Sequence, residues 1–123
     1  MIKVLCLDSY ALWEIQLGNP KFAAIMEKDF IVADWTLVEF YKTILREHNL
    51  ATADYWLRKL LPFCKKAEFR VLIKAVQFQY NNKKRSFSLF DCVGYVFSLE
   101  SNCQFVTGDK EFKGVANVLF MQK

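Results

Sequence analysis

The stretch IKVLCLD, residues 2–8, decides the fold class of this chain. It is an apolar run that is interrupted by Lys3 and ends at Asp8. Nearly continuous apolar runs of this length are typical of strands that are buried on both faces, as in a parallel sheet. Residues 10–17 then have the pattern of a helix closed by Gly18. The chain therefore opens with a strand, an acidic residue at the end of that strand, and a helix.

This alternation of strand and helix continues along the chain. We expect further strands at residues 30–33, 68–72, 104–107 and 118–121, and helices at 21–27, 35–47, 52–61, about 72–80 and 88–101. Such an order favours a three-layer α/β/α sandwich on a mainly parallel sheet. With 123 residues and neither repeats nor linkers, we expect a single domain over residues 1–123.

The composition excludes several classes of site. His48 is the only histidine, so sites built on several histidines are excluded, and its position indicates a solvated cation at a helix end. The four cysteines contain no CxxC pair and lie mostly in apolar segments, which indicates small buried side chains rather than zinc or a disulfide. No apolar run is long enough to span a membrane, and residues 1–7 are too short for a signal peptide. We therefore expect a cytoplasmic protein.

Four acidic residues stand where a strand or turn meets a helix, namely Asp8, Glu39, Asp91 and Asp109. The carboxyl ends of parallel strands meet at one edge of a sheet, and ligands bind there. Carboxylates packed together raise one another's pKa unless a cation neutralises them, and oxygen ligands attract hard divalent cations. We therefore expect a site for Mg²⁺ or Mn²⁺.

Each acid taken singly also has a structural explanation. Residues 36–39 and 88–91 both match the capping-box pattern [ST]-x-x-[DE]. Asp8 and Asp109 precede expected helical turns, and aspartate is a favoured N-cap residue. Helix capping or metal binding would each account for any single one of these acids, so the sequence leaves both roles open for each of them.

The joint arrangement of the acids favours the metal site. The spacing between Asp91 and Asp109 suits one helix and one strand, which return the chain to the same edge of the sheet. Ser9 and Thr107 add hydroxyl groups that could orient a carboxylate or a metal-bound water. One edge of the sheet would then hold all the parts of a hydrolytic site.

Four segments carry a resemblance to a known family: residues 7–9 (LDS), 37–43 (LVEFYKT), 89–95 (LFDCVGY) and 105–112 (FVTGDKEF). In this order and spacing they resemble the PIN-domain family, and more narrowly the small VapC-type ribonuclease toxins, over nearly the whole chain. The resemblance implies that Asp8, Glu39, Asp91 and Asp109 are the acidic quartet, and that Ser9 and Thr107 are supporting hydroxyls. It implies an endoribonuclease that uses one or two Mg²⁺ or Mn²⁺ ions.

Basic residues supply candidates for contacts to RNA, namely Lys83, Lys84, Arg85, Lys110 and Lys113. The net charge is +4, and gathering four acids at one site leaves the remaining surface more basic, which suits a polyanionic substrate. An ordinary solvated loop is the alternative for the segment 81–86. The family resemblance further implies a homodimer and a small antitoxin protein that covers the active-site groove.

Three other functions have to be compared with the nuclease. A non-catalytic PIN-like module that binds RNA or protein has the same sequence features. A receiver domain is disfavoured because no lysine ends the strand at 104–107, and a haloacid-dehalogenase phosphatase because Tyr10 stands where a second aspartate is required.

Overall fold

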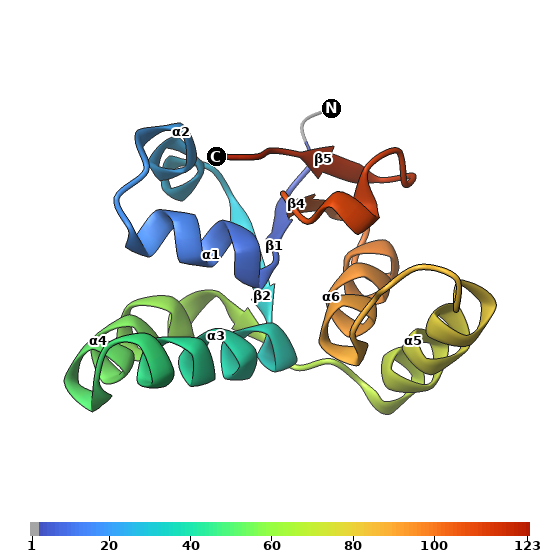
Figure 1. The fold of residues 1–123 in the computed structure, drawn as a ribbon, viewed down its shortest axis with the longest axis horizontal. Helices are drawn as coiled ribbons and strands as arrows, with labels where there is room; N and C mark the ends of the chain where they lie inside the picture. The colour runs from blue at the N-terminus through green and yellow to red at the C-terminus, as the bar shows by residue number, and fades with distance from the viewer. Residues whose placement is uncertain (1–2) are drawn as a thin grey trace.

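The computed structural model describes residues 3–123 (Figure 1). Its five strands form one sheet in the order β3-β2-β1-β4-β5, and every neighbouring pair is parallel. The strands are β1 (Leu5–Leu7), β2 (Phe30–Ala33), β3 (Cys64–Lys65), β4 (Gln104–Thr107) and β5 (Val118–Phe120). The α-helices are α1 (Ser9–Gln16), α2 (Pro20–Ala23), α3 (Asp34–Glu47), α4 (Leu50–Leu60), α5 (Phe69–Asn81) and α6 (Leu89–Glu100). Three short 3₁₀ turns are η1 (Ala24–Glu27), η2 (Leu61–Phe63) and η3 (Lys110–Phe112).

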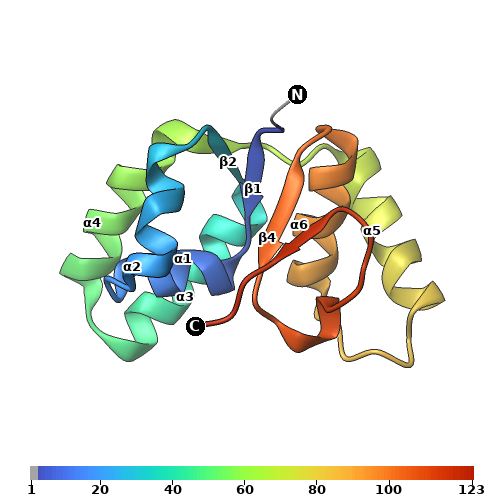
Figure 2. The same cartoon turned by 90° about the horizontal axis from the view of Figure 1, so that it is seen from above.

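Helices cover both faces of the sheet (Figure 2). Helices α1 to α4 pack on one face and α5 and α6 on the other, so the core is divided into two clusters. The central strand β1 contributes to both clusters, because successive side chains of a strand point to opposite faces of the sheet. Leu5 and Leu7 belong to the first cluster, whereas Cys6 between them belongs to the second. The expected α/β/α sandwich on a parallel sheet is confirmed.

Most expected elements are found with small shifts at their ends. The first strand begins at Leu5, and residue 2 of the expected range lies outside the described residues. The helix expected from residue 52 begins at Leu50, because the Asn49 side chain caps it by accepting from the Thr52 amide at 2.8 Å. The cysteines Cys6, Cys92 and Cys103 are buried, as their apolar segments indicated.

The strand expected at residues 68–72 is wrong. That segment starts α5, and the strand β3 lies just before it, where Cys64 pairs with Val32 of β2. Phe69 and Val71 alternate with charged residues as in a strand, but helical spacing places Val71 and Ala75 together against α6. Tertiary packing therefore overrides the local preference.

Within residues 3–123, no helix is both long enough and apolar enough to cross a membrane.

Candidate active site

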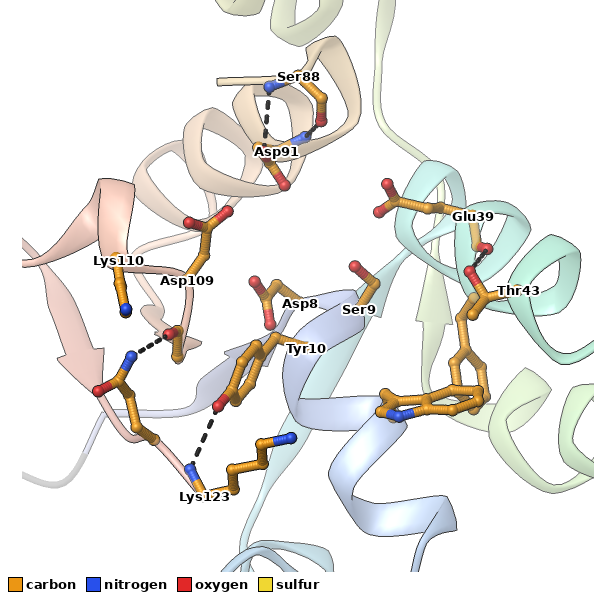
Figure 3. A pocket seen from close by; sticks show the side chains of 14 residues that line it. Asp8, Ser9, Tyr10, Glu39, Thr43, Ser88, Asp91, Asp109, Lys110 and Lys123 are labelled. Atoms are coloured by element: carbon orange, nitrogen blue, oxygen red, sulfur yellow. Dashed lines mark hydrogen bonds between the residues drawn. The ribbon is translucent and has the colours of Figure 1, made fainter. Parts of the chain in front are cut away.

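A pocket of about 690 Å³ lies where the carboxyl ends of β1 and β4 meet. These strands are neighbours at the point where the strand order reverses, which is where open α/β sheets bind ligands. All four predicted acids line the pocket and approach it from different elements (Figure 3). The other lining residues are Ser9, Tyr10, Trp13, Phe40, Thr43, Ser88, Gly108, Lys110, Gln122 and Lys123.

Asp8 lies at the base of the pocket, directly after β1, and is only 4% exposed. Its Oδ1 caps α1 by accepting from the Ala11 amide at 3.0 Å. Burial, with smaller contributions from the charges of Asp91 and Glu39, raises the pKa of Asp8 to about 7, and hydrogen bonds from Thr107 and Ala11 oppose the increase. The hydrogen bonds within the protein therefore do not offset the cost of burying the charged form of Asp8.

Thr107 connects two of the acids. Its side chain is fully buried at the end of β4, where its hydroxyl lowers the pKa of the Asp8 carboxyl and accepts from the Asp109 amide at 3.1 Å. Asp109 in turn caps η3, because its Oδ1 accepts from the Glu111 amide at 3.0 Å. One hydroxyl therefore acts on the Asp8 carboxyl and on the turn that carries Asp109.

Asp91 enters the pocket from the first turn of α6. The predicted capping box with Ser88 is present, so the two residues hydrogen-bond in both directions. Burial raises the pKa of Asp91, and the charge of Asp109 adds to the effect, while the hydrogen bonds from Ser88 lower it. Figure 3 shows a second carboxylate oxygen of Asp91 directed toward the hollow that the acids share.

Glu39 enters from α3, but the capping box predicted for residues 36–39 is wrong. The helix begins at Asp34, so Thr36 lies inside it and is buried, and the N-cap position is Ala33. The Asp34 side chain binds the amides of Trp35 and Ala67 and is not part of the pocket lining. Glu39 therefore has no capping role and is directed toward the other acids (Figure 3).

The environment of Glu39 resembles that of the other acids. Burial raises its pKa and the charge of Asp91 raises it further, whereas a hydrogen bond from Ser9 and the charge of Lys42 lower it. Ser9 therefore supports Glu39 in the way that Thr107 supports Asp8. The two predicted hydroxyl residues are both placed beside acids of the pocket.

The predicted basic residues are divided between the pocket and its surroundings. Lys110 lines the pocket, whereas Lys113 is exposed and outside the lining. The loop carrying Lys83, Lys84 and Arg85 is joined to η3, because the Arg85 guanidinium donates to the carbonyl of Glu111. The ammonium of Lys83 lies 4.9 Å from the ring centroid of Tyr80.

Several residues besides the predicted acids, hydroxyls and lysines also line the pocket. Trp13 lies on α1 four residues after Ser9, a spacing that places both on one face of the helix and could have indicated its position. His48, the exposed C-cap of α3, stacks on Trp13 with ring centroids 5.8 Å apart. Gln122 and Lys123 come from the far end of the chain, and no local pattern places them at the pocket.

The donor set fits a hard divalent cation in its chemistry. All the candidate ligands are oxygen atoms, and within residues 3–123 none of the four acids forms a salt bridge. In the same part of the chain, no three His, Cys, Asp or Glu side chains are grouped closely enough to hold an ion by themselves. Mg²⁺ usually keeps several waters and takes one or two carboxylates, so this spacing fits a hydrated ion.

Comparison of the sequence with protein-family models and with curated proteins found no match. Solved structures match nearly the whole chain at low identity. A toxin-antitoxin complex from Klebsiella pneumoniae shows 14% identity and a TM-score of 0.75, covering 94% of this chain and 95% of that chain. VapC20 from Mycobacterium tuberculosis, described as a sarcin-ricin loop cleaving toxin, shows 15% identity and a TM-score of 0.72, with 93% and 98% covered. VapBC-1 from nontypeable Haemophilus influenzae shows 15% identity and a TM-score of 0.73, with 97% of each chain covered.

At these identities the likeness shows the fold alone. The chain has the PIN-domain fold of the VapC-type structures.

Proposed function

We propose that this protein is an endoribonuclease that hydrolyses RNA phosphodiester bonds with Mg²⁺ or Mn²⁺, and that it is the toxin of a toxin–antitoxin pair. The observation that carries the proposal is the convergence of four acids from separate elements on one pocket at the switch point of the sheet. The fold supports it, because a structural neighbour is described as a toxin that cleaves the sarcin-ricin loop. The proposal places the protein in the cytoplasm, with its RNA substrate.

In the proposed mechanism Asp8, Glu39 and Asp91 would hold the principal ion together with its bound waters, and Asp109 would complete that site or help to hold a second ion. A bound divalent cation stabilises charge on the phosphoryl oxygens and lowers the pKa of an attacking water. The protein keeps the carboxylates in place before substrate arrives. The supporting hydroxyls are those of Ser9, Ser88 and Thr107.

Burial of Asp8 couples metal binding to pH. A carboxyl group whose pKa is near 7 is largely protonated below neutrality, and a cation must displace that proton in order to bind. Metal affinity and cleavage are therefore expected to increase as the pH rises through 7. Phosphates of the RNA would be positioned by basic side chains at the rim, of which Lys110 is the predicted residue that lines the pocket.

The homodimer and the antitoxin are part of the proposal, and exposed apolar side chains offer surface for such contacts. Phe69, Ile73, Val76 and Tyr80 recur at helical spacing along α5, and Phe69 is 75% exposed. Light scattering of the purified protein measures its molar mass and so tests whether it is a dimer. An adjacent reading frame for a small protein with a DNA-binding segment would support the antitoxin, if that small protein co-purifies with this chain. An isolated gene would argue against an antitoxin.

Cleavage of end-labelled RNA tests the enzymatic proposal. Wild-type protein is compared with Asp91→Asn in Mg²⁺, in Mn²⁺ and with EDTA, and both proteins are purified in parallel. Asp29→Asn is the matched control, because it makes the same chemical change at an exposed aspartate outside the pocket. We expect metal-dependent cutting by wild type and Asp29→Asn and a loss of at least about 100-fold in Asp91→Asn.

A non-catalytic module that binds RNA or protein is the second candidate. It is supported by the capping hydrogen bonds of Asp8, Asp91 and Asp109, because this structural role requires no metal. If wild type and Asp91→Asn act alike on several RNAs while both remain folded, the enzymatic proposal fails. Binding of RNA or protein without cleavage would then establish the module.

A further inference from the structure

The last three residues of the chain, 121–123, form a segment that we call the tail, and it is fixed beside the acidic pocket. The Met121 amide donates to the Thr107 carbonyl at 2.9 Å, which continues the pairing of β5 with β4. The Gln122 side chain donates to the Gly108 carbonyl at 3.1 Å, and the Lys123 amide donates to the Tyr10 hydroxyl at 3.2 Å. Three successive residues of the tail are therefore held against β4 and α1.

The Tyr10 side chain, which accepts from the Lys123 amide, is held in place by close packing on both sides. Its ring packs 6.1 Å from the ring of Phe22, which is fully buried in the first core cluster. On its other side lies Gly108, where an added Cβ would overlap with Tyr10 Cε1 and with the carbonyl oxygen of Met121. Ring, glycine and tail thus pack closely, and the hydroxyl that holds Lys123 has a defined position.

The tail brings a cation to an acidic pocket. Among the described residues, the only cationic side chains that line the pocket are Lys110 and Lys123. Figure 3 shows the four acids around the hollow and Lys123 below Tyr10, on the side away from Asp91. Within residues 3–123, the Lys123 ammonium forms no salt bridge with an acid, so its charge is available to a ligand.

This separation of charge suits a strand of RNA. Bound cations at the acids would attract the scissile phosphate, whereas the next phosphate along the strand needs a positive group that the acids do not neutralise. A lysine at the far side of the same pocket meets this requirement. Its ammonium is a point charge that binds a phosphate without reading the base.

We propose that Lys123 is a substrate-positioning residue whose ammonium binds an RNA phosphate next to the scissile one, and that Tyr10 positions the tail for this contact. The inference rests on the proposed endoribonuclease function and adds a substrate contact to it. A contact that is equally strong in the bound substrate and in the transition state lowers KM and leaves kcat unchanged.

The test measures cleavage and binding separately. The variants are Lys123→Ala, Lys123→Arg, Tyr10→Phe and, as the control, Lys28→Ala, which removes an exposed lysine before β2 at the opposite edge of the sheet. Cleavage of a short single-stranded RNA gives kcat and KM. Binding of the same RNA is measured by fluorescence anisotropy at several salt concentrations in proteins that also carry Asp91→Asn.

We expect Lys123→Ala to raise KM about five- to tenfold with kcat changed less than about twofold. The slope of log affinity against log salt should become shallower by about 0.7, the value for one phosphate contact of a single strand. Lys123→Arg should restore KM, Tyr10→Phe should raise it by less than Lys123→Ala, and Lys28→Ala should leave it unchanged.

Two results would overturn the inference. One is a Lys123→Ala protein with the KM and salt slope of Lys28→Ala, and the other is a loss of kcat with unchanged KM. Circular dichroism on each variant confirms that the fold is retained. If wild type cleaves no RNA, the proposed function fails, and the salt slope of RNA binding still decides whether Lys123 contacts a phosphate.

Discussion

Ser88 and Asp91 hold each other at the start of α6. The Ser88 hydroxyl accepts from the Asp91 amide at 3.1 Å, and Oδ2 of Asp91 accepts from the Ser88 amide at 3.0 Å. Asp91 nevertheless lines the acidic pocket. The sequence presented helix capping and metal binding as alternatives for this residue, and the geometry makes them compatible. One carboxylate oxygen can complete the cap while the other faces the pocket.

Replacing Ser88 by alanine separates these two roles. Ser88→Ala is expected to lower the free energy of unfolding by about 1 kcal/mol through loss of the cap. It should also reduce kcat, because loss of the hydroxyl loosens the first turn of α6 that positions Asp91, although the Ser88 backbone amide still donates to the Asp91 carboxylate. Denaturant unfolding and cleavage rates measure the two effects. Ser101→Ala at the other end of α6 is the control, and full kcat in Ser88→Ala would show that Ser88 only caps the helix.

The burial of Asp8 has a consequence for stability. Its folded-state pKa of about 7 lies above that of an unfolded aspartate, so the metal-free protein loses stability as the pH rises from about 4 to about 7. Asp8→Asn removes this penalty and can keep the cap, because asparagine is an equally good N-cap residue. We expect Asp8→Asn to stabilise the metal-free protein by about 4 kcal/mol at pH 8, since each pKa unit between the unfolded and folded values is worth about 1.4 kcal/mol, and to change it little at pH 4.

Urea unfolding of wild type and Asp8→Asn at these two pH values, with EDTA present, measures the difference. The difference between the two proteins contains the titration of Asp8 together with its coupling to Glu39 and Asp91, whose pKa values are also raised. An equal effect at both pH values would show that Asp8 is not responsible for the pH dependence.

Divalent cations should stabilise the folded protein. At a concentration 100 times the dissociation constant, an ion that binds only the folded state adds about 2.7 kcal/mol, which corresponds to a rise in Tm of about 10 °C for a chain of this size. We expect Mn²⁺ to raise the Tm of wild type and Asp29→Asn, and EDTA to reverse the rise. A comparable rise in Asp8→Asn would place the ion elsewhere.

Gly108 permits the close packing of Tyr10 against the tail. Gly108→Ala places a Cβ where Tyr10 and the Met121 carbonyl now lie, so we expect a loss of about 2 kcal/mol in stability and a higher KM for RNA. Gly114→Ala is the comparison, since its φ of +81° makes it unfavourable although no atom lies within 4 Å of the added Cβ. It should cost stability and leave KM unchanged, and equal KM values in both variants would contradict the role of the tail.

Local sequence patterns anticipated much of the fold and failed in identifiable places. The apolar run before Asp8 and the capping box at residues 88–91 were interpreted correctly, because each acts over a few neighbouring residues. The strand expected at 68–72 failed, since packing of α5 on α6 outweighs β propensity. Thr36 matched a capping pattern, but Asp34 begins the helix and places Thr36 in its interior.

The sequence by itself determined the order of strands and helices, the acids that follow or flank them, and the caps that orient Asp8 and Asp91. Only the tertiary structure decided that these acids share one pocket, because that depends on the parallel pairing of β1 with β4. It also decided the raised pKa of Asp8, which comes from burial, and the position of Lys123, which comes from contacts with Tyr10. The physical reason is that propensity and capping act within one or two turns of chain, whereas burial, charge coupling and pocket shape arise from residues that are distant in sequence.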